Sequence, residues 1–357
     1  MTQSTDALFQ PIKLGANDLT NRFAMAPLTR CRAPGHQPNA LMAEYYGQRA
    51  SAGLIISECT MIQPNTSTFA TEPGIYSQEQ IEGWKLTTKA VHEKGGKIFM
   101  QIWHAGRAVH PALNAEENIV SASDIGLSGE LQTPNGKVPF TAPTPLTVEG
   151  IKSIVNDFRQ AAANAIEAGF DGVEIHGANG YLIDQFLRDS SNQREDEYGG
   201  SLENRARFLF EVIDAVSAEI GSDRVGVRLS PLNSYNDMKD SDPEAWIAYL
   251  SEQLNRFNLA YLHVMRADFF GVQQADVVSI ARQHYKGSLM LNMGYSAEEA
   301  AAAIEAGTAD MVAFGTGFLA NPDLPARIKA GAELNEPDQN TFYTQGAEGY
   351  TTYPTMA

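Results

Sequence analysis

The sequence has 357 residues, of which 43% are hydrophobic and 19% are charged, and its 26 basic and 43 acidic side chains give a net charge of −17. This composition is typical of a globular protein, and the length fits one large or two medium domains. The acidic balance, together with the lack of any run of five or more Lys or Arg, makes nucleic acid and anionic membrane surfaces poor partners.

Targeting signals and metal-binding cysteine patterns are both missing from the sequence. The N-terminal region lacks a basic segment followed by an apolar one, and no stretch reaches about 18 apolar residues, so we expect a soluble, cytoplasmic protein. The two cysteines, Cys31 and Cys59, do not have the spacing of a disulfide framework, a zinc site or an iron–sulfur cluster. We therefore expect both to be small buried apolar side chains.

An internal repeat indicates alternating helices and strands. The helix-like segment 165–169 ends in Ala-Gly and is followed by an apolar run that ends at Gly177. Segment 303–307 has the same ending, and its apolar run ends at Gly315. A helix, a glycine cap and a strand thus occur twice in the same order, as expected for an α/β protein with a parallel sheet.

Short apolar runs of this kind predict eight strands, at residues 23–26, 54–57, 98–102, 172–175, 225–229, 261–264, 289–291 and 311–314. Eight parallel strands that alternate with helices close into a (β/α)8 TIM barrel. Apolar residues spaced three and four apart predict a helix over 148–168 that packs on the barrel wall. Ser296 with Glu299 predicts a capping box at the start of a later helix.

One connection is unusually long, because about 70 residues separate the third predicted strand from the fourth. Its segment 127–145 is rich in Gly, Pro, Thr and Asn. Loops of this length usually cover a functional site, and an inert surface insertion is the alternative. We expect a capping loop over about 104–146.

Arg228 is the most informative single residue, because it stands inside an apolar strand. A permanent cation buried there costs several kcal/mol unless it is paired. One candidate partner is Glu174, which precedes His176 by two residues and so lies on the same face of its strand. The other is a bound ligand that carries negative charge, and the residues alone leave both interpretations open.

Polar residues follow the strands, at the end of the barrel where such enzymes place their chemistry. His176, Asn179 and Tyr181 come together after the fourth strand. Two hydrogen-bond donors could hold a carbonyl oxygen there while the phenol supplies a proton. The glycine-rich turns after the seventh and eighth strands are where barrels commonly bind a phosphate.

Several motifs together resemble one family. They are Arg-Phe-Ala-Met-Ala-Pro-Leu-Thr-Arg at 22–30, Gln-Ile-Trp-His-Ala-Gly-Arg at 101–107, His-Gly-Ala-Asn-Gly-Tyr from 176, and segments 191–194, 198–207, 321–324 and 346–354. The sequence resembles the Old Yellow Enzyme family of FMN-dependent ene-reductases, in particular its N-ethylmaleimide and nitroester reductase branch. The resemblance covers nearly the whole chain and implies a single FMN-binding TIM-barrel domain over residues 1–357.

The resemblance implies a role for many residues around a bound FMN. Thr29 would tune the flavin through its O4, and Arg228 would stabilise the anionic reduced ring, which supplies the anion that a buried arginine requires. The full set of implied cofactor-binding residues is Pro27, Leu28, Thr29, Cys59, Gln101, Arg228, Asn292, Gly294, Phe314, Gly315 and Thr316.

The resemblance also implies a reaction. NADPH or NADH would reduce the flavin and leave, which agrees with the lack of a Rossmann fingerprint. His176 and Asn179 would then bind the carbonyl or nitro oxygen of an activated alkene, hydride would pass from the flavin to the β-carbon, and Tyr181 would protonate the α-carbon. Phe69, Trp103 and Tyr343 would line the substrate side, and Pro143 would contribute to a lid. The implied partners are small molecules, with nitroester reduction as a side activity. We also expect the protein to be a monomer or a weak homo-oligomer.

This chain departs from the family pattern at three positions. Thr316 stands where relatives usually have an Arg that grips the FMN phosphate, so FMN binds more weakly or another cation substitutes. Phe69 replaces a Tyr that many relatives have, and Thr29 stands where a related subclass uses a redox-tuning Cys.

Two other functions compete with this interpretation. The first is a metal-dependent hydrolase built on His104, His176, His263 and Glu58, although no His-x-His pair follows a strand. The second is a flavin-binding or redox-sensing barrel without turnover, which would have no need of a placed proton donor such as Tyr181.

Overall fold

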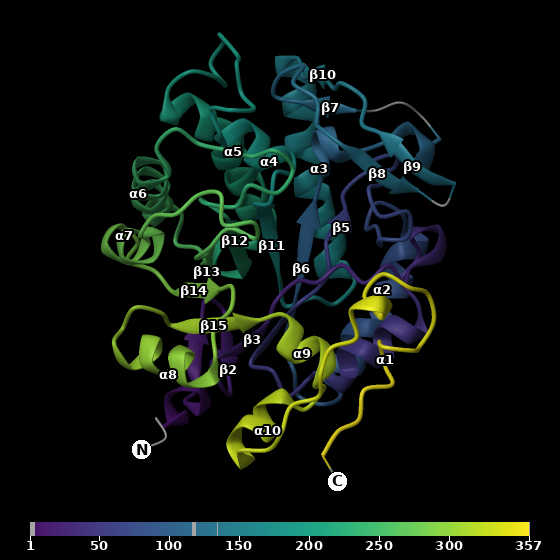
Figure 1. The fold of residues 1–357 in the computed structure, drawn as a ribbon, viewed down its shortest axis with the longest axis vertical. Helices are drawn as coiled ribbons and strands as arrows, with labels where there is room; N and C mark the ends of the chain where they lie inside the picture. Colours follow the sequence, from purple (N-terminus) through teal and green to yellow (C-terminus); the bar gives the residue numbers. More distant parts are fainter. Residues whose placement is uncertain (1–3, 116–118, 134, 357) are drawn as a thin grey trace.

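A closed barrel of parallel strands forms the centre of the computed structural model, which describes residues 4–115, 119–133 and 135–356 (Figure 1). Each strand pairs with the next, and the last pairs with the first. In chain order the strands are β3 (Phe23–Met25), β4 (Leu54–Ile56), β6 (Ile98–Trp103), β11 (Gly172–Gly177), β12 (Val225–Leu229), β13 (Tyr261–Met265), β14 (Leu289–Asn292) and β15 (Met311–Phe314). The predicted (β/α)8 barrel is confirmed.

Helices surround this barrel in Figure 1. They are α1 (Ala40–Gln48), α2 (Gln78–His92), α3 (Val148–Glu167), α4 (Leu182–Leu187), α5 (Leu202–Ile220), α6 (Pro243–Leu254), α7 (Val277–His284), α8 (Ala297–Glu305), α9 (Thr316–Ala320) and α10 (Leu324–Ala330). Helix α3 starts at its predicted residue and buries Ile151, Ile154 and Phe158, because residues at this spacing share one helix face.

The barrel interior is filled by large side chains that cross over glycines. A Cβ on Gly226 would lie 2.2 Å from the Tyr261 ring, and one on Gly172 would lie 2.5 Å from the Phe99 ring. Only glycine leaves room for these rings in the interior. Leu14 belongs to the same buried cluster and comes from a hairpin formed by β1 (Ile12–Leu14) and β2 (Asn17–Leu19).

The long connection after β6 contains more regular structure than its Gly- and Pro-rich composition predicts. Strands β7 (Val120–Ser121) and β10 (Thr144–Pro145) pair in parallel, while β8 (Glu130–Thr133) and β9 (Gly136–Pro139) form an antiparallel hairpin at the edge of the molecule (Figure 1). One more short strand, β5 (Thr60–Met61), pairs with the end of β6. The capping insertion is therefore a folded unit.

The predicted capping box at α8 forms only in part. Ser296 Oγ accepts a hydrogen bond from the Glu299 backbone N–H at 3.1 Å. The Glu299 carboxylate, however, pairs with the Arg266 guanidinium, which attracts it more strongly than a neutral backbone N–H does. Within the described ranges, no helix combines the length and apolar character needed to cross a bilayer.

Candidate active site

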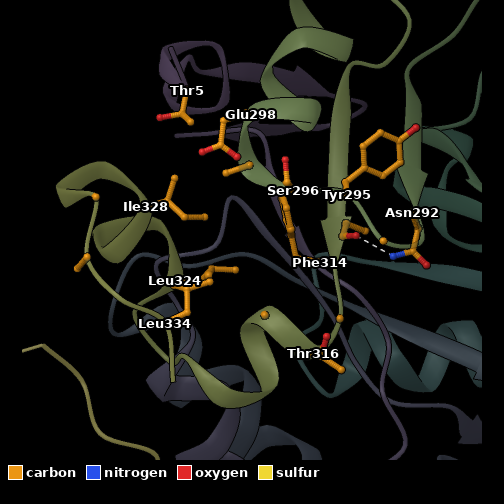
Figure 2. Close-up of a pocket in the computed structure, with 17 residues that line it drawn as sticks. Thr5, Asn292, Tyr295, Ser296, Glu298, Phe314, Thr316, Leu324, Ile328 and Leu334 are labelled. Atoms are coloured by element: carbon orange, nitrogen blue, oxygen red, sulfur yellow. Dashed lines mark hydrogen bonds between the residues drawn. The ribbon is translucent and has the colours of Figure 1, made fainter. Parts of the chain in front are cut away.

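A cavity of about 640 Å³, here called the central cavity, lies at the carboxyl ends of the barrel strands. A second hollow of about 530 Å³, here called the side hollow, is lined by residues at the ends of β14 and β15 and by residues of α8 and α10 (Figure 2). The two spaces share the lining residues Asn292, Gly294, Gly315 and Thr316, so they lie side by side.

Most of the residues predicted to bind a cofactor or substrate line the central cavity. These are Pro27, Leu28, Thr29, Phe69, Asn179, Tyr181, Arg228, Asn292, Gly294, Gly315, Thr316 and Tyr343. Phe314 lines only the side hollow. The others, Cys59, Gln101, Trp103 and His176, are buried directly behind residues of the cavity wall and contact them or their supporting groups.

Arg228 is buried beside His176 and His263 on the neighbouring strands, and its guanidinium is only partly satisfied. Its Nη2 donates to Asn292 Oδ1 at 3.0 Å, while its buried Nε finds no hydrogen-bond partner among the described residues. Burial lowers the pKa of Arg228, which the nearby Glu174 opposes. A buried cation with an unused donor at a cavity wall fits an anionic ligand.

Glu174 is not the ion-pair partner of Arg228, so that interpretation of the sequence is wrong. Its carboxylate accepts hydrogen bonds from Gln101 at 2.8 Å and Tyr261 at 3.1 Å, and it lies 2.8 Å from His263 Nδ1. Burial raises the pKa of Glu174, but His263, Arg228 and Gln101 together lower it below its usual value. Glu174 therefore stays ionised and fixes the side chain of Gln101 beneath the cavity.

Asn179 and His176 are oriented as hydrogen-bond donors. Asn179 Oδ1 accepts a hydrogen bond from Asn233 at 2.8 Å, which leaves its amide N–H groups for a ligand. His176 Nδ1 accepts a hydrogen bond from the Ala178 backbone N–H at 3.3 Å, so its Nε2 carries the proton. Burial, with Arg228 and His263 nearby, lowers the pKa of His176 well below 6.5 and keeps the ring neutral.

Tyr181 is held between two aromatic rings. Its ring centroid lies 5.1 Å from those of Trp103 and His176, in both cases edge to face. Burial raises the pKa of Tyr181 well above 10, so the phenol keeps its proton at neutral pH. A protonated phenol at the cavity wall can act as a general acid.

Thr29 is supported from behind by two residues at the end of β4. Its Oγ1 lies 3.0 Å from Cys59 Sγ, and the adjacent Arg30 backbone N–H donates to the buried Glu58 carboxylate at 3.2 Å. Burial raises the pKa of Cys59 well above 9, so the thiol is protonated. Both cysteines are free and buried, as predicted.

Buried arginines bring Tyr343 to the cavity from the C-terminal end of the chain. Arg30 donates to the carbonyl oxygens of Phe342 at 3.0 Å and Gly349 at 2.6 Å. Arg32 donates to the carbonyls of Thr341 and Phe342 at 2.8 and 2.9 Å. These bonds fix the irregular segment that places the Tyr343 ring parallel to Phe69, with centroids 6.2 Å apart.

Eight residues that line the central cavity are not among the predicted site residues: Ala26, Arg30, Tyr235, Phe269, Phe270, Met293, Leu319 and Phe342. Tyr235 follows β12, and Phe269 and Phe270 follow β13, so the rule that functional residues follow strands could have found these three. Met293, which lies between the predicted residues Asn292 and Gly294, has a φ of 91°, a strained value for a side chain of this size.

The predicted lid residue, Pro143, is buried but does not line the central cavity. Three capping residues, Leu127, Ser128 and Phe140, line another hollow, which shares Tyr235 and Phe270 with the central cavity.

The residues proposed for a metal-dependent hydrolase do not come together. His263 is bound to Glu174, His104 lies 3.1 Å from Gln63, and Glu58 pairs with Tyr46 and the Arg30 backbone. Across the described part of the chain, no three His, Cys, Asp or Glu side chains are grouped so that they could hold a metal ion. That alternative is wrong.

Comparison with known proteins agrees with this geometry. The NADH:flavin oxidoreductase / NADH oxidase family matches residues 7–335. The chain belongs to this family. It is 54% identical, over 99% of both chains, to the probable flavin mononucleotide-dependent alkene reductase of Leishmania infantum.

Solved structures of this flavin oxidoreductase family have the same fold as the chain. The old yellow enzyme from Trypanosoma cruzi is 43% identical with a TM-score of 0.96, over 99% of this chain and 100% of that one. Morphinone reductase in complex with tetrahydroNAD is 46% identical with a TM-score of 0.93, over 98% of both chains. The chain is therefore an FMN-dependent NAD(P)H oxidoreductase of the Old Yellow Enzyme type, as the resemblance predicted.

The site residues fit FMN. The unused Arg228 Nε at the wall of the central cavity suits the electron-rich part of a flavin ring. At the other end, a Cβ on Gly294 would meet no atom within 4 Å, so the turn after β14 leaves open space for a ligand. Two adjacent spaces of this kind suit a molecule with a ring at one end and a polar tail at the other.

Proposed function

We propose that this chain reduces C=C bonds activated by a carbonyl or nitro group, as its Leishmania relative's name also indicates. The observation that carries this proposal is the set of His176, Asn179 and Tyr181 beside the cavity that Arg228 faces. Two oriented donors and one protonated phenol are the groups that an activated alkene requires. A flavin-binding barrel without turnover would have no use for this set.

The ring end of the FMN would lie in the central cavity, between the residues from β3 and Arg228. Pro27, Leu28 and Thr29 would contact the ring from one side, while Arg228 would hold its electron-rich edge. Gln101, whose side chain is fixed by Glu174, would form a hydrogen bond with the flavin ring from beneath the cavity. When bound, FMN supplies the hydride that it has taken from a reduced nicotinamide.

The remaining chemistry belongs to the side chains around the substrate. The His176 and Asn179 N–H groups would hold the carbonyl or nitro oxygen and stabilise the negative charge that develops there. Tyr181 would give its proton to the α-carbon. Phe69, Trp103 and Tyr343 would exclude water and pack against the alkene.

Several finer features stay predictions. Reduced nicotinamide and alkene would use the central cavity in turn, and the tetrahydroNAD bound by morphinone reductase supports a nicotinamide as the reductant. We also propose one FMN-binding domain over residues 1–357 and nitroester reduction as a side activity. A cytoplasmic location and a monomer or weak homo-oligomer also stay predictions.

An anaerobic double-mixing stopped-flow experiment tests the proposed function. The FMN-loaded protein is first mixed with NADPH and then with 2-cyclohexenone, while the flavin absorbance is followed. We expect bleaching in the first step and recovery in the second, with cyclohexanone as the product. If the flavin bleaches but no activated alkene restores it, the roles of His176, Asn179 and Tyr181 are refuted.

A further inference from the structure

The side hollow is the part of the site where the phosphate end of a flavin would lie. It is formed by the glycine-containing turns after β14 and β15, the two strands after which barrels commonly bind a phosphate. Asn292, Gly294, Gly315 and Thr316 line both this hollow and the central cavity. A flavin with its ring at Arg228 would place its tail here.

The side hollow contains no positive charge. Figure 2 shows the 17 residues that line it, and they include no Lys, Arg or His. The single charged residue among them is Glu298, an acidic one, and Figure 2 places it near Thr5 and Ser296. Thr316 offers a hydroxyl at the position where the family resemblance predicted a guanidinium.

One cation lies beside the turn after β14, but it is already occupied. Arg266 Nε donates to the Met293 carbonyl at 2.8 Å, and its Nη2 donates to the Gly294 carbonyl at 3.0 Å. Both Nη atoms also bond the Glu299 carboxylate, and the guanidinium lies 3.7 Å above the Tyr295 ring. Arg266 therefore braces the back of the turn, and Glu299 offsets its charge.

We propose that the phosphate of FMN adds little to its affinity for this site, so that the site binds riboflavin nearly as tightly as FMN. The inference rests on the proposed function in so far as the flavin ring occupies the central cavity. A charge-assisted Arg–phosphate pair would favour FMN by about 10- to 100-fold, and no such pair is present here among the described residues. Neutral donors attract the phosphate less, while Glu298 and the net charge of −17 repel it.

Competition between the two flavins tests this proposal directly. The full chain is equilibrated with equal concentrations of FMN and riboflavin, and the bound flavins are separated and quantified by chromatography. We expect a preference for FMN of less than about tenfold, compared with the 10- to 100-fold of a charge-assisted pair. A preference of about tenfold or more, as a charge-assisted pair would give, overturns the proposal.

The salt dependence of FMN binding gives an independent test. Because salt screens repulsion as well as attraction, FMN affinity should stay constant or rise between 0.02 and 0.5 M NaCl, concentrations that span roughly a fivefold change in screening length. Affinity that falls steeply with salt would mean that a cation holds the phosphate, and would overturn the proposal.

Two variants separate the remaining interpretations. Thr316→Arg should tighten FMN binding by about tenfold or more while leaving riboflavin binding unchanged. Arg266→Met should change the affinity for both flavins by the same factor, since it acts through the turn. If Arg266→Met weakens FMN alone, Arg266 holds the phosphate and the proposal is wrong. A chain that binds neither flavin refutes the proposed function itself.

Discussion

The two ends of the flavin site are built in opposite ways. At the central cavity, Arg228 is buried in the wall, and behind it the buried Glu174 carboxylate is fixed by Gln101, Tyr261 and His263. In the side hollow, the wall is made of turns, hydroxyls and apolar side chains, and its one charged residue, Glu298, is exposed. The protein thus concentrates its buried polar groups at the end where charge changes during the reaction.

This difference follows from what each end has to do. Buried polar groups are costly to hold, yet they act strongly on a reacting group because little water screens them. The tail of a flavin only needs an anchor, which backbone and hydroxyl groups can provide. Changes at the ring end should therefore alter the chemistry, while changes at the tail end should alter only binding.

Tyr181→Phe should have the largest effect. Loss of the phenolic proton leaves flavin reduction by NADPH unchanged and slows reoxidation by 2-cyclohexenone about 10²- to 10⁴-fold, the range typical of a general acid. Stopped-flow measurement of the two half-reactions separates these steps. Tyr198→Phe, which also removes one hydroxyl from a buried tyrosine but at a bond to Glu211, serves as the matched control. Unchanged alkene turnover in Tyr181→Phe would remove this residue from the mechanism.

Glu58→Gln should change how the free energy of unfolding depends on pH, because Glu58 is a buried carboxylate behind the central cavity. Burial raises the pKa of Glu58 from 4.5 to about 7. Because the unfolded chain gives up this proton more readily, the native state loses about 3 kcal/mol of stability as pH rises from about 4.5 to 7. The variant lacks this loss, so its stability relative to the wild type should rise between pH 5 and pH 8.

Urea unfolding of both proteins at saturating FMN, at pH 5 and pH 8, measures this change. The two bonds that the carboxylate makes, to the Tyr46 hydroxyl and the Arg30 backbone, are lost or weakened at both pH values. A stability difference that does not change with pH would show that Glu58 is ionised throughout this range.

Arg228→Met should weaken the binding of the flavin ring in the central cavity without unfolding the barrel. A hydrogen bond from a charged group contributes about 1.5–3 kcal/mol, so we expect FMN to bind about 10- to 100-fold more weakly. If the same interaction favours the anionic reduced flavin, the two-electron midpoint potential falls by about 30–60 mV. Arg256→Met, at an arginine that stacks on Phe210 away from the site, is the control. Tight FMN binding with an unshifted potential would refute the role of Arg228.

Cys59→Ala should have the smallest effect. Its thiol lies 3.0 Å from the Thr29 hydroxyl, and one neutral hydrogen bond contributes about 0.5–1.5 kcal/mol. We expect a shift of the flavin midpoint potential of about 10–30 mV, and a smaller one in Cys59→Ser, which keeps a donor at this position. Spectroelectrochemical titration measures both shifts. A shift as large as that of Arg228→Met would mean that Cys59 contacts the flavin directly.

The periodicity of the sequence predicted the barrel well, because eight similar apolar runs each specify one buried strand. It did not predict strands β7 to β10, because these short segments are rich in Gly and Pro and lack a run of apolar residues, and β7 pairs with β10 only through contacts distant in the sequence. The motifs led to Asn179, Tyr181 and Arg228, which the cavity brings together. The search for polar residues at strand ends did not predict Tyr235 and Phe269. No pattern in the sequence showed that Glu174 bonds Gln101 and His263 in place of Arg228.

Following the transferred hydrogen atoms into the product tests the proposed alkene reduction most directly. The FMN-loaded protein converts 2-cyclohexenone with NADPH carrying deuterium at the transferable position of its nicotinamide, and the product is analysed by NMR. We expect cyclohexanone labelled at the β-carbon, with the α-hydrogen derived from solvent, because His176 and Asn179 hold the oxygen and Tyr181 protonates the α-carbon. Deuterium at the carbonyl carbon of an allylic alcohol would contradict this proposal.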